Sequence, residues 1–216
     1  MKINKDLSDK RQVYTKNELL ESNIPDNPME LFRDWYAEAE EEEQGEVNAF
    51  TLATVGKDLM PYSRVVLLKR FTWEGFVFYT NYQSKKGRQI AANNQVALSF
   101  FWDKLERQVI INGLAEKQLE NLSDGYFESR PRGSRLGALA SDQSQPIVSR
   151  EALDEKLQKL ENQYKGKEIL RPKHWGGYLV KPVRIEFWQG RPNRMHDRIC
   201  YTLQDDYNWK IERLQP

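Results

Sequence analysis

The chain has 216 residues, of which 33 are lysine or arginine and 32 are aspartate or glutamate, so its formal net charge is only +1. A charge this small excludes a general electrostatic attraction to nucleic acid or to a membrane surface, and any anion-binding role must be local. One cysteine, two histidines, a polar beginning and no long apolar run exclude an internal disulfide and a usual zinc site, and they lead us to expect a single-domain cytoplasmic protein with no nucleic-acid or membrane partner.

The first part of the chain is predicted to be an arm followed by a helix. Residues 1–26 are expected to form a mobile N-terminal arm, and residues 27–216 a folded domain. Asn27 is a candidate N-cap, and Pro28 suits the first position of a helix. An apolar stripe then predicts a helix that reaches about Glu43; it consists of Leu31, Phe32, Trp35 and Tyr36.

Most of the remaining chain has the pattern of antiparallel strands. Residues typical of strands are enriched at 48–55, 62–71, 75–81, 96–102, 107–119, 176–188, 197–203 and 207–214. The short links that follow residues 55 and 71 suit hairpins. Helical patterns interrupt the strands at 122–129 and 150–164. We therefore expect a mainly β fold with flanking helices, arranged as a closed or nearly closed antiparallel barrel.

A basic turn at residues 84–88 is the first feature that resembles a binding site. Ser84 is a candidate N-cap, which places Lys85, Lys86 and Arg88 in the first turn of a helix. The helix dipole disfavours cations at this end unless an anion also binds there, and a phosphate would meet free N–H groups as well as basic side chains. The alternative is a solvated basic turn or a weak RNA contact. The balanced charge of the chain favours a small phosphorylated ligand.

A second basic feature lies in residues 63–70, where Arg64 and Lys69 bracket four apolar residues. Strict strand alternation would put the two cations on opposite faces. Either they serve different groups, or the strand twists or bulges between them. The alternative is a buried barrel strand with snorkelling basic ends.

A third basic feature follows the helical pattern at 122–129. Tyr126 and Arg130 lie one helical turn apart, and Ser134 is expected on a loop, because Pro131 and Gly133 should break the helix. A guanidinium and two hydroxyl groups would make a receptor for a second phosphate. The alternative is an ordinary helix C-terminus with favourable arginines.

The tract at 186–198 is the densest collection of functional groups and contains Trp188, Arg194, His196 and Arg198. If it runs as a strand beyond Pro192, then Arg194, His196 and Arg198 share one face. Two cations beside one imidazole lower the pKa of the histidine unless an anion or an acidic group lies among them. The alternative is a rim of salt bridges with Asp197 and Glu186.

A set of ordered motifs resembles the pyridoxamine 5′-phosphate oxidase family. The motifs are RVVLLK (64–69), FYTN (78–81), SKK (84–86), LERQV (105–109), SRPR (129–132), QS (143–144), WGGY (175–178), EFWQG (186–190) and RMHDR (194–198). The resemblance covers nearly the whole chain, including RQVY at 11–14 and the terminal RLQP. The ordered set is far more specific than any one motif.

The resemblance implies an FMN-binding split β-barrel that acts as a homodimer, with each active site built from both subunits. It also implies oxidation of pyridoxamine 5′-phosphate or pyridoxine 5′-phosphate to pyridoxal 5′-phosphate, with O2 reduced to H2O2. In such an enzyme the flavin carries the redox chemistry, and the protein places the substrate and tunes the electrostatics.

Motif matching carries the family's functional residues onto this sequence. The implied FMN contacts of one subunit are Arg64, Val65, Val66, Leu67, Leu68, Lys69, Tyr79, Thr80, Lys85, Lys86 and Gln108. The residues implied to close over FMN, in part from the other subunit, are Gln143, Ser144, Trp188 and Arg198. The implied substrate-phosphate receptor is Lys69, Tyr126, Arg130 and Ser134. At the reacting end of the substrate the resemblance puts Met195 and the candidate catalytic residues Arg194 and His196, while Arg11 and Tyr14 match an arm that can cover the site.

Small departures from the family pattern keep the functional groups. The common SRK reads SKK here, which retains charge at Lys85 but loses a bidentate guanidinium, and Met195 replaces a more usual leucine. Two other interpretations remain open. One is a related split-barrel flavoprotein with a different substrate, in which the substrate residues would not all be present together. The other is a non-catalytic binder of pyridoxal phosphate or RNA, which would not take up FMN.

Overall fold

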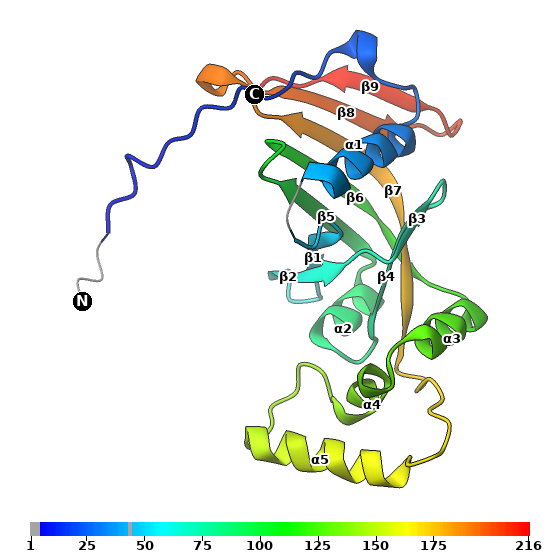
Figure 1. Cartoon of the computed structure of the whole chain (residues 1–216). Helices are drawn as coiled ribbons and strands as arrows, with labels where there is room; N and C mark the ends of the chain where they lie inside the picture. The colour runs from blue at the N-terminus through cyan, green and yellow to red at the C-terminus, as the bar shows by residue number, and fades with distance from the viewer. Residues whose placement is uncertain (1–4, 43–44) are drawn as a thin grey trace. The chain divides into compact units, whose positions relative to one another are not determined.

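The computed structural model describes residues 5–42 and 45–216 (Figure 1). The helices are α1 (Pro28–Glu42), α2 (Lys85–Ala92), α3 (Glu120–Ser129), α4 (Arg132–Ala140) and α5 (Arg150–Gln163), with 3-10 turns η1 (Glu21–Asn23) and η2 (Pro192–Arg194). The strands are β1 (Ala49–Val55), β2 (Pro61–Leu67), β3 (Arg70–Thr72), β4 (Gly75–Asn81), β5 (Gln95–Trp102), β6 (Arg107–Lys117), β7 (Trp175–Gln189), β8 (Asp197–Leu203) and β9 (Trp209–Arg213).

The chain forms two compact units. Unit 1 contains the chain up to Val47 together with Phe100–Ile110 and Arg184–Pro216. Unit 2 contains Asn48–Ser99 and Ile111–Val183. The strands β5, β6 and β7 contribute residues to both units.

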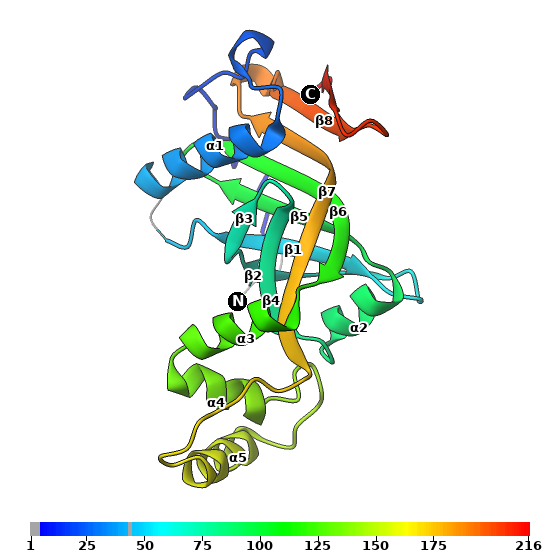
Figure 2. The same cartoon turned by 90° about the vertical axis from the view of Figure 1, so that its right-hand side faces the viewer.

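Unit 2 is built on antiparallel strand pairs. β1 pairs with β2 and with β5, and β4 pairs with β3 and with β7. The links after β1 and β3 are the predicted hairpins. Phe50 and Phe78 meet edge to face inside this sheet, with ring centroids 6.0 Å apart, within the range that aromatic pairs prefer. Figures 1 and 2 show α3, α4 and α5 gathered at one end of the unit, with α5 outermost.

In unit 1, α1 packs against the unit's parts of β5 and β7. The side chain of Asn27 accepts a hydrogen bond from Met29 N (2.9 Å), which confirms the predicted helix start. The apolar stripe of the helix faces inward, and Trp35 meets Phe187 edge to face at 5.2 Å between ring centroids. β8 pairs antiparallel with both β7 and β9. The helix is described to Glu42; Glu43, its expected end, lies outside the described residues.

Three expectations about local structure are wrong. The strand predicted at 62–71 is broken, because β2 ends at Leu67 and β3 begins at Arg70. Ser134 lies in helix α4 rather than on a loop, since Pro131 ends one helical segment and stands at the N-cap of the next. The chain does not run as a strand from Pro192 to Arg198: it turns through η2, where Asn193 and Arg194 have φ values of 56° and 62°.

Candidate functional site

A cavity of about 680 Å³ lies in unit 2 between the strands and the helices that follow them. Its lining includes three cations and no carboxylate. The residues that line it are Val65, Val66, Leu67, Lys69, Tyr79, Thr80, Asn81, Lys86, Tyr126, Arg130, Pro131, Ser134, Gly137, Ala138, Ser141, Gln143 and Trp175. Eleven of these are candidate site residues from the sequence, so the unit-2 part of the prediction converges on one cavity.

The start of α2 supplies one of the cations. Ser84 caps the helix as predicted, because its side chain accepts a hydrogen bond from Gly87 N (3.2 Å). Lys86 then points at the cavity, and its Nζ donates to Gln143 Oε1 (3.0 Å) and Thr80 Oγ1 (3.3 Å). Burial, together with the nearby Arg64 guanidinium, lowers the pKa of Lys86 to about 8. A phosphate at this position would therefore meet a partly desolvated ammonium group.

The other two cations of the basic turn face elsewhere. Lys85 Nζ lies 3.8 Å from the centroid of the Tyr62 ring, in a cation–π contact. Arg88 donates from Nη1 to the backbone oxygen of Gln83. Neither residue lines the cavity. Of the three cations predicted to converge on one anion, the structure brings only Lys86 to the cavity.

Arg64 and Lys69 serve different groups, which was the first of the two alternatives. Arg64 Nη1 donates to Thr54 Oγ1 (2.7 Å) and to the backbone oxygen of Leu52 (3.0 Å), so its guanidinium joins β2 to β1. Lys69 follows the end of β2 and lines the cavity. Leu68, which lies between the two cations in the sequence, is buried and is not part of the cavity lining. Arg64 lies on β2, whereas Lys69 lies in the break between β2 and β3.

The second cluster of the cavity combines stacked rings with a guanidinium. Tyr79 and Tyr126 stack with ring centroids 3.9 Å apart, and Tyr79 stacks on Trp175 at 5.6 Å. The Arg130 guanidinium lies 4.6 Å from the Trp175 ring centroid. Among the described residues, its buried Nη1 has no hydrogen-bond partner. A buried donor without a partner is costly, so the site fits an anion that would accept from it.

The WGGY motif explains how these rings come together. A side chain at Gly177 would put its Cβ 2.9 Å from Cε1 of Tyr79, and one at Gly176 would meet the Tyr82 hydroxyl oxygen at 2.2 Å. Both glycines are therefore required by close approach on β7. Sequence reasoning placed WGGY among the family motifs but did not name Trp175 as a site residue, although its ring lines the cavity. The helix α4 contributes Gly137 and Ala138, which the loop prediction also missed.

A separate aromatic cluster lies in unit 1. The His196 ring lies 4.6 Å from that of Trp188, and Tyr14 contacts both rings at centroid distances of 5.7 Å to Trp188 and 5.8 Å to His196. His196 Nδ1 accepts a hydrogen bond from Arg191 N (3.0 Å), which leaves Nε2 to carry the proton of the neutral ring. Burial and then the Arg194 charge lower the pKa of His196, against the opposing effect of Asp197.

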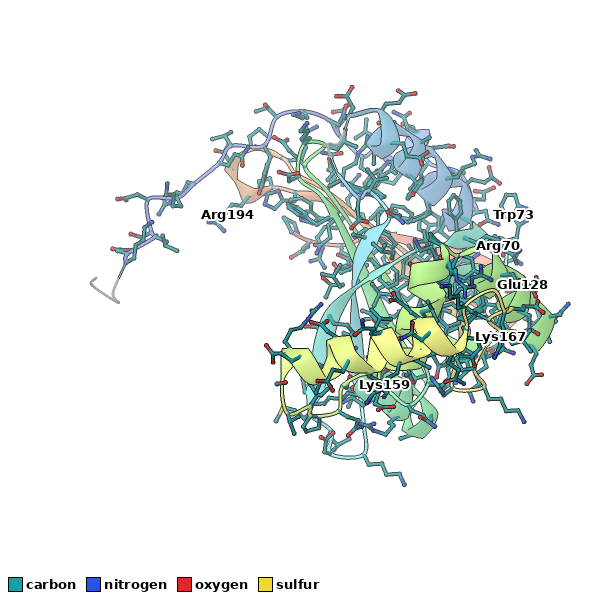
Figure 3. The ribbon with its side chains drawn as sticks, turned by 60° about the horizontal axis from the view of Figure 1, so that its bottom comes forward. Arg70, Trp73, Glu128, Lys159, Lys167 and Arg194 are labelled. Atoms are coloured by element: carbon teal, nitrogen blue, oxygen red, sulfur yellow. The ribbon has the colours of Figure 1, made fainter. Side chains whose placement is uncertain are left out.

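The arginines around this cluster differ. Arg198 pairs with the buried Glu186, with Nη2 and Oε1 2.7 Å apart, and donates from Nη1 to the backbone oxygen of Gln215 (2.9 Å). Arg198 therefore makes the salt bridge to Glu186 that the alternative predicted. Arg194 and Met195 are exposed, and Figure 3 shows Arg194 projecting from its turn into solvent. Because of this turn, Arg194, His196 and Arg198 do not share a strand face.

Three further candidate residues do not line the cavity: Arg11, Gln108 and Ser144. Gln108 lies on β6 within unit 1 and is partly buried. Ser144 is exposed and has a φ of 70°, and Arg11 is exposed. Gln143, predicted to close over the cofactor, lines the cavity of its own chain. Within the described ranges there is no group of three or more His, Cys, Asp or Glu side chains that could hold a metal ion, and Cys200 is buried.

Family models match most of the chain. One described as "Pyridoxamine 5'-phosphate oxidase" matches residues 37–164, and one described as "Pyridoxine 5'-phosphate oxidase C-terminal dimerisation region" matches residues 175–216. A pyridoxine/pyridoxamine 5′-phosphate oxidase of Flavobacterium psychrophilum is 61% identical over 98% of this chain and 100% of its own length. One of Acaryochloris marina is 51% identical over 97% of this chain and 95% of its own.

Solved structures are similar in fold. PhzG from Burkholderia lata, in complex with tetrahydrophenazine-1-carboxylic acid, has a TM-score of 0.86 at 29% identity and covers 94% of this chain and 100% of its own. A pyridoxamine 5′-phosphate oxidase-related, FMN-binding protein of Nostoc punctiforme has a TM-score of 0.68 at 18% identity, over 86% of this chain and 97% of its own. The predicted fold class, an antiparallel split barrel with flanking helices, is confirmed. In the part of the chain that the structure describes, no helix has the length and apolarity needed to cross a membrane.

Proposed function

Because the chain belongs to the pyridoxine/pyridoxamine 5′-phosphate oxidase family, we propose that it oxidises pyridoxamine 5′-phosphate and pyridoxine 5′-phosphate to pyridoxal 5′-phosphate. The enzyme is an oxidoreductase that uses FMN, with O2 as acceptor and H2O2 as a product; the amine substrate also takes up water and releases ammonia. The match to a C-terminal dimerisation region supports a homodimer. A cytoplasmic location is part of the same proposal, and the single free cysteine is consistent with a reducing compartment.

The observation that carries the proposal is the charge of the unit-2 cavity. Three cations, Lys69, Lys86 and Arg130, line it without a carboxylate, and one guanidinium nitrogen is buried without a partner. FMN carries a phosphate, and so does the substrate, pyridoxamine or pyridoxine 5′-phosphate, which is called the vitamer below. Phosphate oxygens are strong acceptors for such donors. The volume of about 680 Å³ lies in the range typical of cofactor sites. The residues present therefore fit the cofactor.

Each cation is assigned to one phosphate by its surroundings. We assign the FMN phosphate to Thr80 of β4 and to Lys86 at the start of α2, where helix N–H groups also favour an anion. The vitamer phosphate is assigned to Lys69, Arg130 and the hydroxyl groups of Tyr126 and Ser134. Burial raises the pKa of Tyr126, which keeps its phenol protonated and able to donate.

The other residues orient the ligands. When bound, FMN would supply the redox chemistry between the vitamer and O2. Trp188 and Arg198 are assigned to the flavin by motif. Arg194 is assigned to the pyridine ring of the vitamer and holds that ring in position for oxidation. His196, neutral at pH 7 because its pKa is lowered, orients the 4′ substituent.

Oxygen consumption tests the proposal. Purified protein with FMN and pyridoxine 5′-phosphate should consume O2 and form pyridoxal 5′-phosphate in equal amounts, whereas unphosphorylated pyridoxine should react far more slowly. A protein that takes up FMN but oxidises neither phosphorylated vitamer would be a split-barrel flavoprotein with another substrate. A colourless protein that cannot take up FMN would be a non-catalytic binder. Either result would overturn the proposal.

A further inference from the structure

Glu106 is a buried carboxylate that holds the N-terminal segment. It stands just before β6 with a φ of 55°, and only 4% of its surface is exposed. Its Oε2 accepts hydrogen bonds from Thr15 N (2.8 Å) and Lys16 N (3.1 Å), across about 90 residues of sequence. Among the described residues it has no salt-bridge partner. Burying a carboxylate is costly unless donors satisfy it, so the two arm amides are the groups that make this burial tolerable.

The same segment is fixed further along by other charged side chains of unit 1. Arg191 Nη1 donates to the backbone oxygen of Asn17 (3.2 Å), and Asp197 Oδ2 accepts from Leu19 N (3.0 Å). These contacts lie on the C-terminal side of Lys16. Glu106 therefore makes the hydrogen bonds nearest to Tyr14, and it decides where that ring is held.

Tyr14 comes directly before the two bonded amides and packs into the aromatic cluster. Its ring meets Trp188 and His196 edge to face. The contact is tight at Gly190, where a Cβ would lie 2.7 Å from Tyr14 Cγ. Gly190 N in turn donates to the backbone oxygen of Glu106 (2.7 Å). Glu106 thus binds the arm through its side chain and the residue after β7 through its backbone oxygen.

We propose that Glu106 is a positioning residue that sets the arm so that Tyr14 packs on Trp188 and His196. The inference rests on the proposed function, in which His196 serves the vitamer, and on the resemblance, which puts Tyr14 on an arm that can cover the site. Glu106 does not touch the substrate: its effect passes through Tyr14. It should therefore change how well the vitamer binds more than how fast the bound vitamer reacts.

Steady-state kinetics in a double-mutant cycle test this dependence. Glu106→Ala should raise KM for pyridoxine 5′-phosphate by about tenfold, since two charge-assisted hydrogen bonds are lost, with kcat changed by less than about threefold. Glu106→Gln keeps an acceptor oxygen without the charge and should have a smaller effect. In a Tyr14→Ala background, Glu106→Ala should add little, because its route to the substrate is already gone. Asp9→Asn, which alters an exposed arm carboxylate away from these contacts, is the matched control and should leave KM unchanged.

A second measurement is independent of turnover. Trypsin should cut after Lys16 slowly in the FMN-loaded parent and at least about tenfold faster in Glu106→Ala, since the open fraction of the segment sets the rate. Glu106→Gln serves if the alanine variant does not fold. Unchanged cleavage, or an undiminished KM effect in the Tyr14→Ala background, overturns the inference. If the parent shows no oxidase activity, the proposed function fails, while the cleavage rates still decide whether Glu106 holds the arm.

Discussion

The two units treat their cations in opposite ways. In unit 2 the cavity brings together Lys69, Lys86 and Arg130 with no carboxylate in the lining. In unit 1 the arginines near the aromatic cluster are paired: Arg198 with Glu186, and Arg213 with Asp197 and Glu21. The cavity of unit 2 keeps its positive charge unneutralised, which suits an incoming anion, whereas the ion pairs beside the aromatic cluster of unit 1 hold chain segments in place.

Among the described arginines beside the aromatic cluster, Arg194 departs from this pattern, and its removal should have the largest effect. It is exposed, and within the described ranges it forms no salt bridge. Arg194→Ala should lower kcat by about 100-fold or more, because the vitamer ring loses the group that orients it, while FMN stays bound. Stopped-flow flavin reduction together with the flavin absorbance of the purified variant checks both parts. An unchanged rate of flavin reduction would show that Arg194 has no role in the reaction. The cations proposed to bind the substrate would then all lie in the cavity of unit 2.

Lys86→Ala tests the unneutralised charge of unit 2. Loss of one charge-assisted contact of ~1.5–3 kcal/mol should weaken FMN binding by about 10- to 100-fold. Riboflavin, which lacks the phosphate, should lose less than about threefold. Fluorescence titration of both flavins measures the two effects, with Lys86→Arg as the variant that keeps the charge. Equal losses for FMN and riboflavin would show that Lys86 packs against the cavity wall rather than binding phosphate.

The pH dependence of FMN binding should follow Lys86. Its pKa in the folded protein is lowered to about 8, so the side chain is protonated below that pH and loses its charge as the pH rises through it. FMN affinity should therefore be level from pH 6.5 to 7.5 and fall several-fold by pH 9. Riboflavin titrated over the same range should show no such fall, and Lys86→Arg should flatten the curve for FMN. A flat curve in the parent would mean that the phosphate does not depend on this ammonium group.

The sequence predicts the starts of two helices correctly, but it misses one helix and one turn. The caps at Asn27 and Ser84 depend on neighbouring residues, and both are confirmed. Helix α4 was missed because Pro131 and Gly133 signal a break, and Pro131 both follows one helix and precedes another. The left-handed Asn193 and Arg194 turn a predicted strand aside. Such a turn is decided by one or two residues, which a pattern of alternating polarity does not register.

For the site, the motifs predict a set of residues but not what each one contacts in the folded chain. Arg64 was assigned with Lys69 to the cofactor, yet it donates to Thr54 and Leu52. This contact depends on the register of β1 with β2, in which Leu52 stands opposite Arg64. Likewise, the partner of Arg198 follows from β7 and β8, which put Trp188 opposite Arg198 and Glu186 two residues away. Register is a tertiary property, so single-sequence motifs cannot supply it.

The smallest expected effect separates the two adjacent lysines at the start of α2. Lys85 Nζ lies against the Tyr62 ring and is absent from the cavity lining, whereas Lys86 is part of it. Lys85→Ala should therefore weaken FMN binding by less than about threefold, as expected for a partly screened charge near the site. The same fluorescence titration, repeated at low and high salt, measures this loss beside that of Lys86→Ala. A loss as large as that of Lys86→Ala would mean that Lys85 leaves Tyr62 for the phosphate, and that unit 2 rearranges its cations when the cofactor binds.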